Sequence, residues 1–293
     1  MTRMSAATIG MERLGNRGLQ SRQTAGTFLL LLPALIFLGG WFIVPIGQLF
    51  LLSFDMPGGA LASYGELLGS TVFRQVFVNT LILAVVVTAF CVLLACPAAY
   101  LLSRARGFWF TLALYCVLAP FWISVLVRTF SWMLLLERNG PVNTWLMWAG
   151  VTSSPLPLLF NYFSVCLGMI HVLLPYAVLP IYSAMLKVDR RLLQASEGLG
   201  ASGATTFLKV YLPLILPGIL AGATFVFLLA LGFYITPALL GGGRVMMLAV
   251  MIEQQVHQTL NWAFAAALSA VLLAVTLLVY AVAQRFNRTG AEA

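Results

Sequence analysis

The chain has 293 residues, of which 61% are hydrophobic and only 8% are charged. A soluble domain carries about 25% charged residues, so this composition excludes an ordinary soluble protein and indicates an integral membrane protein. The formal net charge is +8, but no basic face is spread over a soluble domain, which argues against a nucleic-acid-binding function.

Six stretches without Asp, Glu, Lys or Arg are long enough for helices of roughly 20 apolar residues to cross a membrane. In chain order they predict spans at about 24–52, 76–102, 108–135, 161–185, 210–235 and 261–284. Their apolar runs are continuous, unlike the alternating strands of a membrane barrel, and lipid excludes an open sheet. The predicted fold class is therefore all-α, a polytopic membrane protein with six transmembrane helices.

The segments between these spans are expected to be mostly loops, at 53–74 and 237–260 among others. The loop 137–160 differs, because two tryptophans three residues apart within Val142–Trp148 predict a helix at the membrane interface. All four cysteines lie in apolar spans without metal-ligand spacing, and we expect free thiols and no metal site. These cysteines are Cys91, Cys96, Cys116 and Cys166.

The basic residues predict the orientation. With the N-terminus inside, the inner segments hold 12 of the 16 Lys and Arg residues and the outer segments hold three, while Arg128 lies within a span. Cytoplasmic loops carry the excess of Lys and Arg, so both termini are predicted to be cytoplasmic. The chain then divides into a cytoplasmic N-terminal segment (1–23), a transmembrane domain (24–286) and a cytoplasmic tail (287–293).

The inner segment 187–209 is rich in small residues. Its run Gly198–Gly203 spells G-x-G-x-x-G, but a dinucleotide site needs a preceding strand, whereas membrane helices flank this segment on both sides. Asp189 can cap a helix start, Gly198 and Gly200 can end that helix, and Ser202 can cap a second one. We therefore predict a helix–turn–helix hairpin between the fourth and fifth spans.

One face of the predicted hairpin carries Leu192, Ala195, Ser196 and Leu199, at helical spacings of three, four and seven. This face is narrow and largely made of small residues, so the surface of another protein could approach it closely. A solvated inner loop with ordinary helix caps is the alternative interpretation.

The same segment resembles a family motif. Gln194-Ala195-Ser196, then Gly200, then Val210-Tyr-Leu212-Pro213 has the spacing of the cytoplasmic "EAA" loop in permease subunits of binding-protein-dependent ABC importers. Three residues depart from that motif, namely Gln194 for Glu, Ser196 for Ala and Val210 for Ile. Three further segments resemble the spermidine/putrescine (PotB-like) type of permease. They are Pro120–Arg128, Leu179–Ser183 and Leu240–Arg244.

The resemblance implies a transport subunit of a bacterial inner membrane, not an enzyme. It implies as partners an ABC ATPase dimer, a second, related permease chain and a periplasmic or external solute-binding protein, with lipid around them and no nucleic acid. ATP and Mg are expected on the ATPase, because this sequence lacks a Walker lysine motif, and no cofactor is expected on this chain. Closure of the ATPase dimer would move the coupling hairpin, whose predicted coupling residues are Leu192, Gln194, Ala195, Ser196, Leu199 and Gly200.

The resemblance also implies a polyamine or related amine as solute. Acidic side chains or aromatic faces bind ammonium groups, and no acid lies within a predicted span. The candidates for the substrate path are therefore aromatic, with Arg128 added because a charge inside the membrane usually marks function. They are Trp122, Arg128, Tyr176, Phe233 and Tyr234. Ordinary packing remains the alternative for each aromatic residue.

Two polar residues of the spans have simpler interpretations as well. In a straight third helix Arg128 lies 22 residues beyond Arg106, or roughly 33 Å, which would place it at the outer interface as an anchor. We expect His171, near the middle of the fourth span, to hydrogen-bond a neighbouring helix. A self-contained secondary transporter or channel is the alternative function, and it predicts intramembrane carboxylates for ion coupling.

Overall fold

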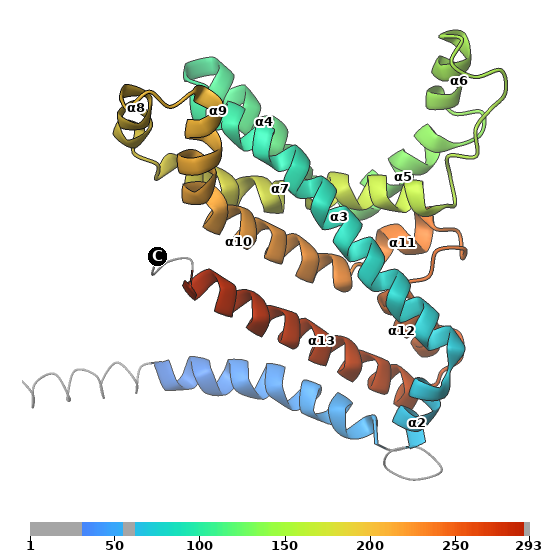
Figure 1. Cartoon of the computed structure of the whole chain (residues 1–293). Helices are drawn as coiled ribbons and strands as arrows, with labels where there is room; N and C mark the ends of the chain where they lie inside the picture. The colour runs from blue at the N-terminus through green and yellow to red at the C-terminus, as the bar shows by residue number, and fades with distance from the viewer. Residues whose placement is uncertain (1–30, 55–61, 290–293) are drawn as a thin grey trace, which may run out of the picture.

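The computed structural model describes residues 31–54 and 62–289, and every regular element in this part is a helix, as the composition predicts (Figure 1). The helix Leu31–Leu52 comes first. It is followed by α2 (Ala62–Gly69), α3 (Thr71–Arg104), α4 (Gly107–Trp122), α5 (Val125–Leu136), α6 (Pro141–Trp148), α7 (Tyr162–Leu186), α8 (Arg190–Gly198), α9 (Gly203–Thr206), a π-helical turn (Phe207–Tyr211), α10 (Leu212–Leu231), α11 (Ile235–Leu240), α12 (Leu248–His257) and α13 (Trp262–Thr289).

Within the described residues, five helices are long and apolar enough to cross a membrane: Leu31–Leu52, Thr71–Arg104, Tyr162–Leu186, Gly203–Leu231 and Trp262–Arg285. α4 and the segment Val125–Trp148 make a sixth crossing when this bent pair is counted as one span. The predicted six-span, all-helical fold is confirmed in these terms. The predicted segment 1–23 lies outside the described residues.

The third predicted span was wrong in one respect, because it is not a straight helix. α4 ends at Trp122, α5 begins at Val125, and the bend between α4 and the segment Val125–Trp148, which holds α5 and α6, is 101°. Two predicted loops also contain helices, since α2 lies in 53–74 and α11 and α12 lie in 237–260. Helices of six to ten residues depend on tertiary packing, which apolar periodicity in the sequence does not reveal.

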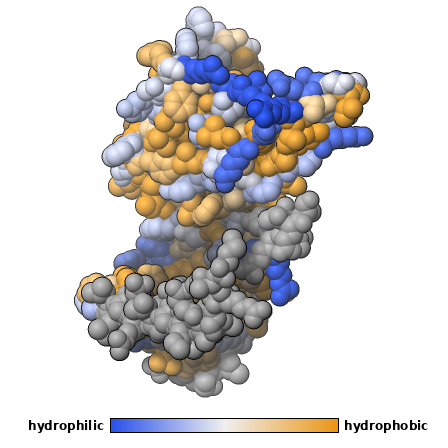
Figure 2. All heavy atoms as spheres, turned by 90° about the vertical axis from the view of Figure 1, so that its left-hand side faces the viewer, coloured by the Kyte–Doolittle hydropathy of each residue, from blue (hydrophilic) through white to orange (hydrophobic). Residues whose placement is uncertain are grey.

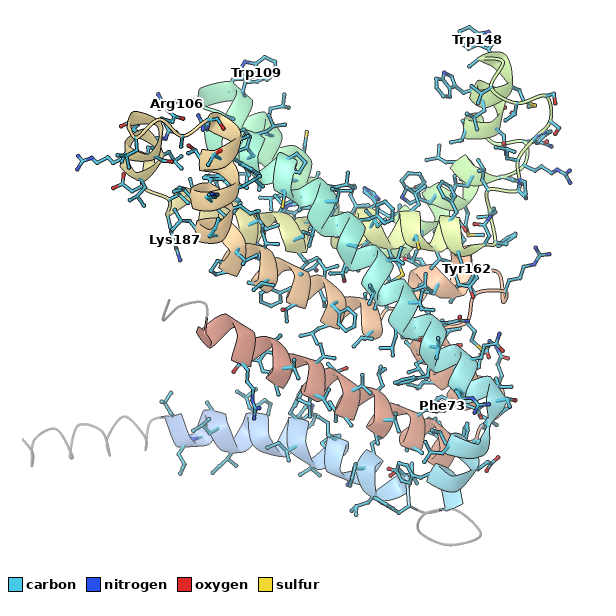
Figure 3. The ribbon with its side chains drawn as sticks, viewed as in Figure 1. Phe73, Arg106, Trp109, Trp148, Tyr162 and Lys187 are labelled. Carbon is cyan, nitrogen blue, oxygen red and sulfur yellow. The ribbon has the colours of Figure 1, made fainter. Side chains whose placement is uncertain are left out.

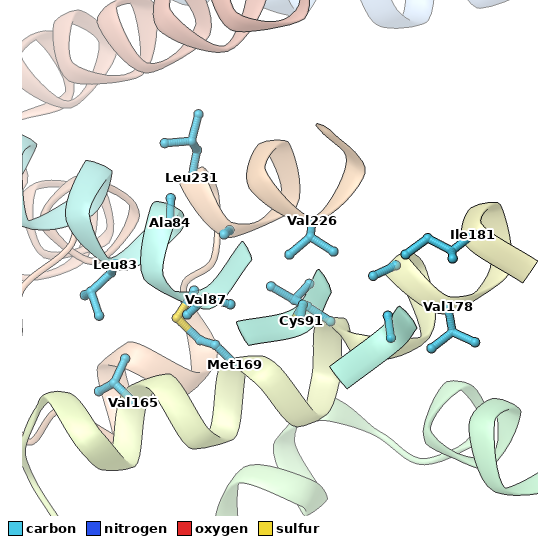
Figure 4. Packing of buried hydrophobic residues seen from close by; sticks show 14 of the residues in the cluster. Leu83, Ala84, Val87, Cys91, Val165, Met169, Val178, Ile181, Val226 and Leu231 are labelled. Atoms are coloured by element: carbon cyan, nitrogen blue, oxygen red, sulfur yellow. The ribbon is translucent and has the colours of Figure 1, made fainter. Parts of the chain in front are cut away.

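The core is formed where α3, α7 and α10 cross (Figure 4). Cys91 of α3, Met169 of α7 and Val226 of α10 are fully buried there. The four cysteines are free thiols, and the Cys91 thiol lies 3.8 Å from the carbonyl oxygen of Ile170. The Cys91 sulfur thus packs inside the bundle, as expected for an apolar span, whereas Cys116 is exposed.

Two glycines of α10 let it approach α7 closely. A Cβ atom on Gly222 would lie 3.0 Å from the carbonyl oxygen of Ala177, and one on Gly218 would overlap the Cβ atom of Ala184. Small residues four apart allow such contact in membranes, where close packing replaces the hydrophobic effect as the force between helices. The run Gly218-Ile-Leu-Ala-Gly222 is therefore a structural motif that our sequence analysis missed.

A second, smaller cluster joins α2, α12, α13 and the start of α3. The Thr80 hydroxyl connects two of these elements, because it donates to the carbonyl oxygen of Val76 and accepts from the backbone N–H of Leu248. The helix Leu31–Leu52 adds little to either cluster, since its hydrophobic side chains are exposed. It leaves a large apolar surface, as lipid contact requires.

The loops are divided between two ends of the bundle. α8, α9 and the C-terminal end of α13 lie at the left of Figure 1, and α2, α6 and α12 lie at the right. In Figure 3, Arg106 and Lys187 lie at the first end and Trp148 and Tyr162 at the second. α6 falls within the predicted loop 137–160, and its two tryptophans are exposed as an interfacial helix requires.

Candidate functional site

The turn between α8 and α9 is built by local capping. The Asp189 carboxylate accepts a hydrogen bond of 2.9 Å from the backbone N–H of Arg191 and so caps the start of α8. The Ser202 hydroxyl accepts one of 3.3 Å from the backbone N–H of Thr205 at the start of α9. Both caps lie at the positions that the sequence predicts.

Gly200 forms the turn itself. Its φ is +85°, a left-handed conformation that side chains rarely adopt. The N–H of Ala201 donates to the carbonyl oxygen of Ser196 (3.2 Å), and the N–H of Gly200 donates to that of Glu197 (2.9 Å). This pair of bonds is the Schellman arrangement that ends a helix. Because nothing lies within 4 Å of a Cβ placed at Gly200, the backbone conformation, and not crowding, requires glycine there.

The predicted coupling residues are mostly free on this hairpin. Leu199, at the tip, is 90% exposed, and Leu192, Gln194 and Ala195 are exposed as well. Ser196 differs, because its hydroxyl lies 3.1 Å from that of Thr206 and joins α8 to the start of the next span. An alanine at this position, as in the family motif, would lack that bond.

Polar groups gather around the hairpin. Figure 2 faces the end of the molecule that carries α8 and α9, and hydrophilic side chains collect in its upper part among apolar ones. The exposed basic residues of the inner segments in the described part of the chain include Arg104, Arg106, Lys187, Arg190, Arg191 and Lys209. A basic surface with an apolar tip at Leu199 is suited to contact another protein.

A pocket of about 500 Å³ lies where α4 and α5 break, between α7 and the end of α10. Four of the five predicted path residues line it, namely Trp122, Arg128, Tyr176 and Phe233. Tyr234, the fifth, is adjacent in sequence but is not part of the pocket wall. Trp122 is 88% exposed, while Phe121 packs edge-on against Tyr176 with ring centroids 5.0 Å apart.

The position of Arg128 corrects our estimate from the sequence. That estimate assumed a straight helix from Arg106 to the outer interface, but the chain bends by 101° between α4 and the segment Val125–Trp148, which begins with α5. Arg128 is only 7% exposed, and its Nε atom has no hydrogen-bond partner among the described residues. It is therefore a buried cation beside a pocket and does not lie at the protein surface as an interfacial anchor would.

Hydrogen bonds hold α5 in this position. The indole N–H of Trp132 donates to Nδ1 of His171 on α7, over 3.0 Å, which confirms that His171 bonds a neighbouring helix. The hydroxyls of Thr129 and Thr236 lie 3.1 Å apart and join α5 to α11. Both bonds lie within one turn of Arg128 and fix the helix that carries it.

Sequence reasoning missed one acidic residue near the path. Glu253 of α12 falls within the predicted loop 237–260, but in the structure its carboxylate lies close enough to the Tyr234 hydroxyl to interact with it electrostatically. Glu253 is partly buried, and Tyr234 is 37% exposed. The fold of 237–260 brings the two together, and the 19-residue separation in sequence gives no signal of it.

A helical bundle with five crossings, or six when the bent pair is counted as one, defines a multi-pass membrane protein, and it carries an exposed hairpin at one end and a pocket at the broken span. Residues 26–289 match the family described as "Binding-protein-dependent transport system inner membrane component", and the chain belongs to this family. It is a permease subunit of an ABC importer in the inner membrane and not an enzyme, because ATP hydrolysis in such importers belongs to a partner chain.

The chain is similar to two curated permeases. It is 34% identical over 256 residues to the spermidine/putrescine transport system permease protein PotB of Haemophilus influenzae, covering 86% of this chain and 88% of that one. It is 34% identical over 223 residues to PotB of Escherichia coli (strain K12), covering 75% and 81%.

A solved structure has a similar fold. It is a bacterial alginate ABC transporter in complex with an alginate pentasaccharide-bound periplasmic protein, with a TM-score of 0.75 at 18% identity over 92% of this chain and 96% of that one.

Proposed function

We propose that this permease forms part of the path for a polyamine or a related amine. The observation that carries the proposal is the 34% identity, over 86% of the chain, to a permease named for spermidine and putrescine transport. The partners would be a second, related permease chain, an external solute-binding protein and an ABC ATPase dimer that binds ATP and Mg.

The hairpin α8–α9 is proposed as the contact with the ATPase. Leu199 and the small residues beside it leave an open, narrow surface, and Gly200 sets the sharp turn that presents it. Because the π-helical turn continues α9 directly into α10, displacement of the hairpin would be transmitted to the membrane core. ATP-driven closure of the ATPase would thereby change the core from inward-facing to outward-facing.

We place this end of the bundle in the cytoplasm, with both termini. The excess of Lys and Arg in the inner segments supports this orientation. In a variant without native cysteines, Lys187→Cys should react with a membrane-impermeant thiol reagent only from the cytoplasmic side. Reaction from outside intact cells would contradict the orientation.

Amine recognition has support in the side chains of this region. The Glu253 carboxylate beside Tyr234 offers a negative charge and a ring face, and the aromatic pocket wall adds Trp122 and Phe233. Ring faces attract cations by about 0.5–2 kcal/mol each. A path with aromatic walls and one acid could pass an amine without holding it tightly.

The direct test uses the cognate external binding protein and the whole complex. Calorimetry should detect binding of at least one amine to the binding protein in a screen of spermidine, putrescine and 4-aminobutyrate, and proteoliposomes with both permeases and the ATPase should take up the bound amine only when ATP is supplied. Binding of non-amine solutes alone would overturn the proposed solute. ATP-independent uptake driven by an ion gradient would instead favour the self-contained transporter.

A further inference from the structure

The start of α5 forms an unusual wall of the pocket. Because α4 ends at Trp122, the first N–H groups of α5 have no preceding turn to accept their hydrogen bonds, and the Ser124 side chain does not cap them. Ile123, Ser124 and Val125 all line the pocket. Free N–H groups and the helix dipole give such a terminus a partial positive charge that favours anions.

Arg128 adds a full charge to the same wall. It is 93% buried, lines the pocket and lies one turn after Ser124, with its backbone N–H bonded to the carbonyl oxygen of Ser124. Its Nε atom has no partner, and no ion pair joins the guanidinium to an acid among the residues that the structure describes. A buried cation is stabilised by an opposite charge, so an anionic group in this pocket would interact favourably with Arg128.

We propose that the pocket at the α4–α5 break binds a carboxylate group of the transported solute. The guanidinium of Arg128 and the first N–H groups of α5 would hold its oxygens. The aromatic side chains Trp122, Tyr176 and Phe233 would surround the rest of the molecule. This inference rests on the proposed function and narrows it, since the solute would be an amine that also carries an acid group.

Two four-carbon probes distinguish a site for an amine that carries an acid group from a site for a plain polyamine. 4-Aminobutyrate and putrescine both carry an ammonium group, and they differ in whether the other end is a carboxylate or a second ammonium. In the complete complex without native cysteines, Ser124→Cys places a thiol on the pocket wall. The rate at which N-ethylmaleimide alkylates this thiol is measured in the presence of each probe. It is compared with the rate in sodium chloride of equal ionic strength.

We expect 4-aminobutyrate, but not putrescine, to slow the alkylation. With Arg128→Gln the protective concentration should rise at least about tenfold, the change expected when a hydrogen bond to a charged group is lost. Arg138→Gln, on an exposed residue of another pocket, should leave protection unchanged. The comparison of the two probes needs no arginine variant, so it stays decisive if Arg128→Gln does not assemble.

Three outcomes would overturn the inference: equal protection by putrescine, no protection by either probe, or protection that Arg128→Gln leaves unchanged. If a carboxylate of the second permease occupies the pocket, neither probe protects. The screen on the external binding protein does not involve this pocket. Failure of the amine function and failure of the anion site are therefore distinguishable.

Discussion

At the scale of single residues, two exposed tryptophans of the chain differ in their surroundings. Trp122 is 88% exposed and lines the pocket at the break between α4 and α5. Trp148 is 83% exposed at the end of α6, within the loop 137–160. Exposure alone does not distinguish the two residues. The pocket assigns Trp122 to the path, while Trp148 fits the interfacial role that tryptophan often has.

We expect Trp122→Ala to raise the amine concentration for half-maximal uptake by roughly two- to thirtyfold, because a cation over an aromatic ring gains about 0.5–2 kcal/mol. Uptake by proteoliposomes measures the effect, and copurification of the second permease and the ATPase checks assembly. Trp148→Ala is the matched control and should transport normally. Wild-type uptake by an assembled Trp122→Ala complex would remove this ring from the path.

At the scale of elements, the charge-free runs were sufficient to place the six crossings, because charges are excluded from lipid. They could not reveal the break at Ile123–Ser124, since Pro120 precedes it inside α4 and prolines also lie within the continuous helices α3 and α7. α11 was missed as well. This helix packs against α7, where a Cβ on Gly168 would meet the side chain of Thr236. The contact joins segments that are distant in the sequence, so local patterns do not reveal it.

The hairpin could be predicted in more detail than the pocket, for a physical reason. Its caps at Asp189 and Ser202 and its turn at Gly200 are local, so the sequence carries their signals within a few residues. The pocket joins Arg128 of α5 to Tyr176 of α7. Such a site depends on the angle of a broken helix, which residue types alone do not determine.

The crossing of α7 and α10 gives a prediction at this scale. Gly222→Val would push a side chain into the backbone of Ala177 and should cost about 1–3 kcal/mol, as other overpacked cores do. We expect a lower melting temperature of the purified permease. The same change at Gly47, which is exposed on the first helix with nothing within 4 Å, should leave it unaltered. Equal melting temperatures would contradict the close crossing.

At the scale of the whole molecule, a continuous route joins the hairpin to the pocket. The Ser196–Thr206 contact ties α8 to α9, which continues through the π-helical turn into α10. Leu229 near the end of α10 and Phe233 just beyond it line the same pocket as Arg128. Because packed helices move as rigid bodies, we expect a shift of the hairpin to change the shape of this wall.

The most direct test of this account is the variant Gly200→Asp. A residue with a Cβ atom in the left-handed conformation costs about 1–2 kcal/mol, and its carboxylate would enter the proposed contact with the ATPase. Gly203→Asp is the control, because it adds the same charge at the start of α9, where acidic groups are favoured and nothing lies within 4 Å.

The measurement is ATP hydrolysis stimulated by the loaded binding protein, together with uptake, in proteoliposomes that hold the complete complex. We predict that Gly200→Asp keeps the melting temperature of the membrane core but loses stimulation and uptake, while Gly203→Asp retains most of both. Full stimulation and full uptake in Gly200→Asp would show that the hairpin is only a loop, and the account of coupling through α8–α9 would be wrong.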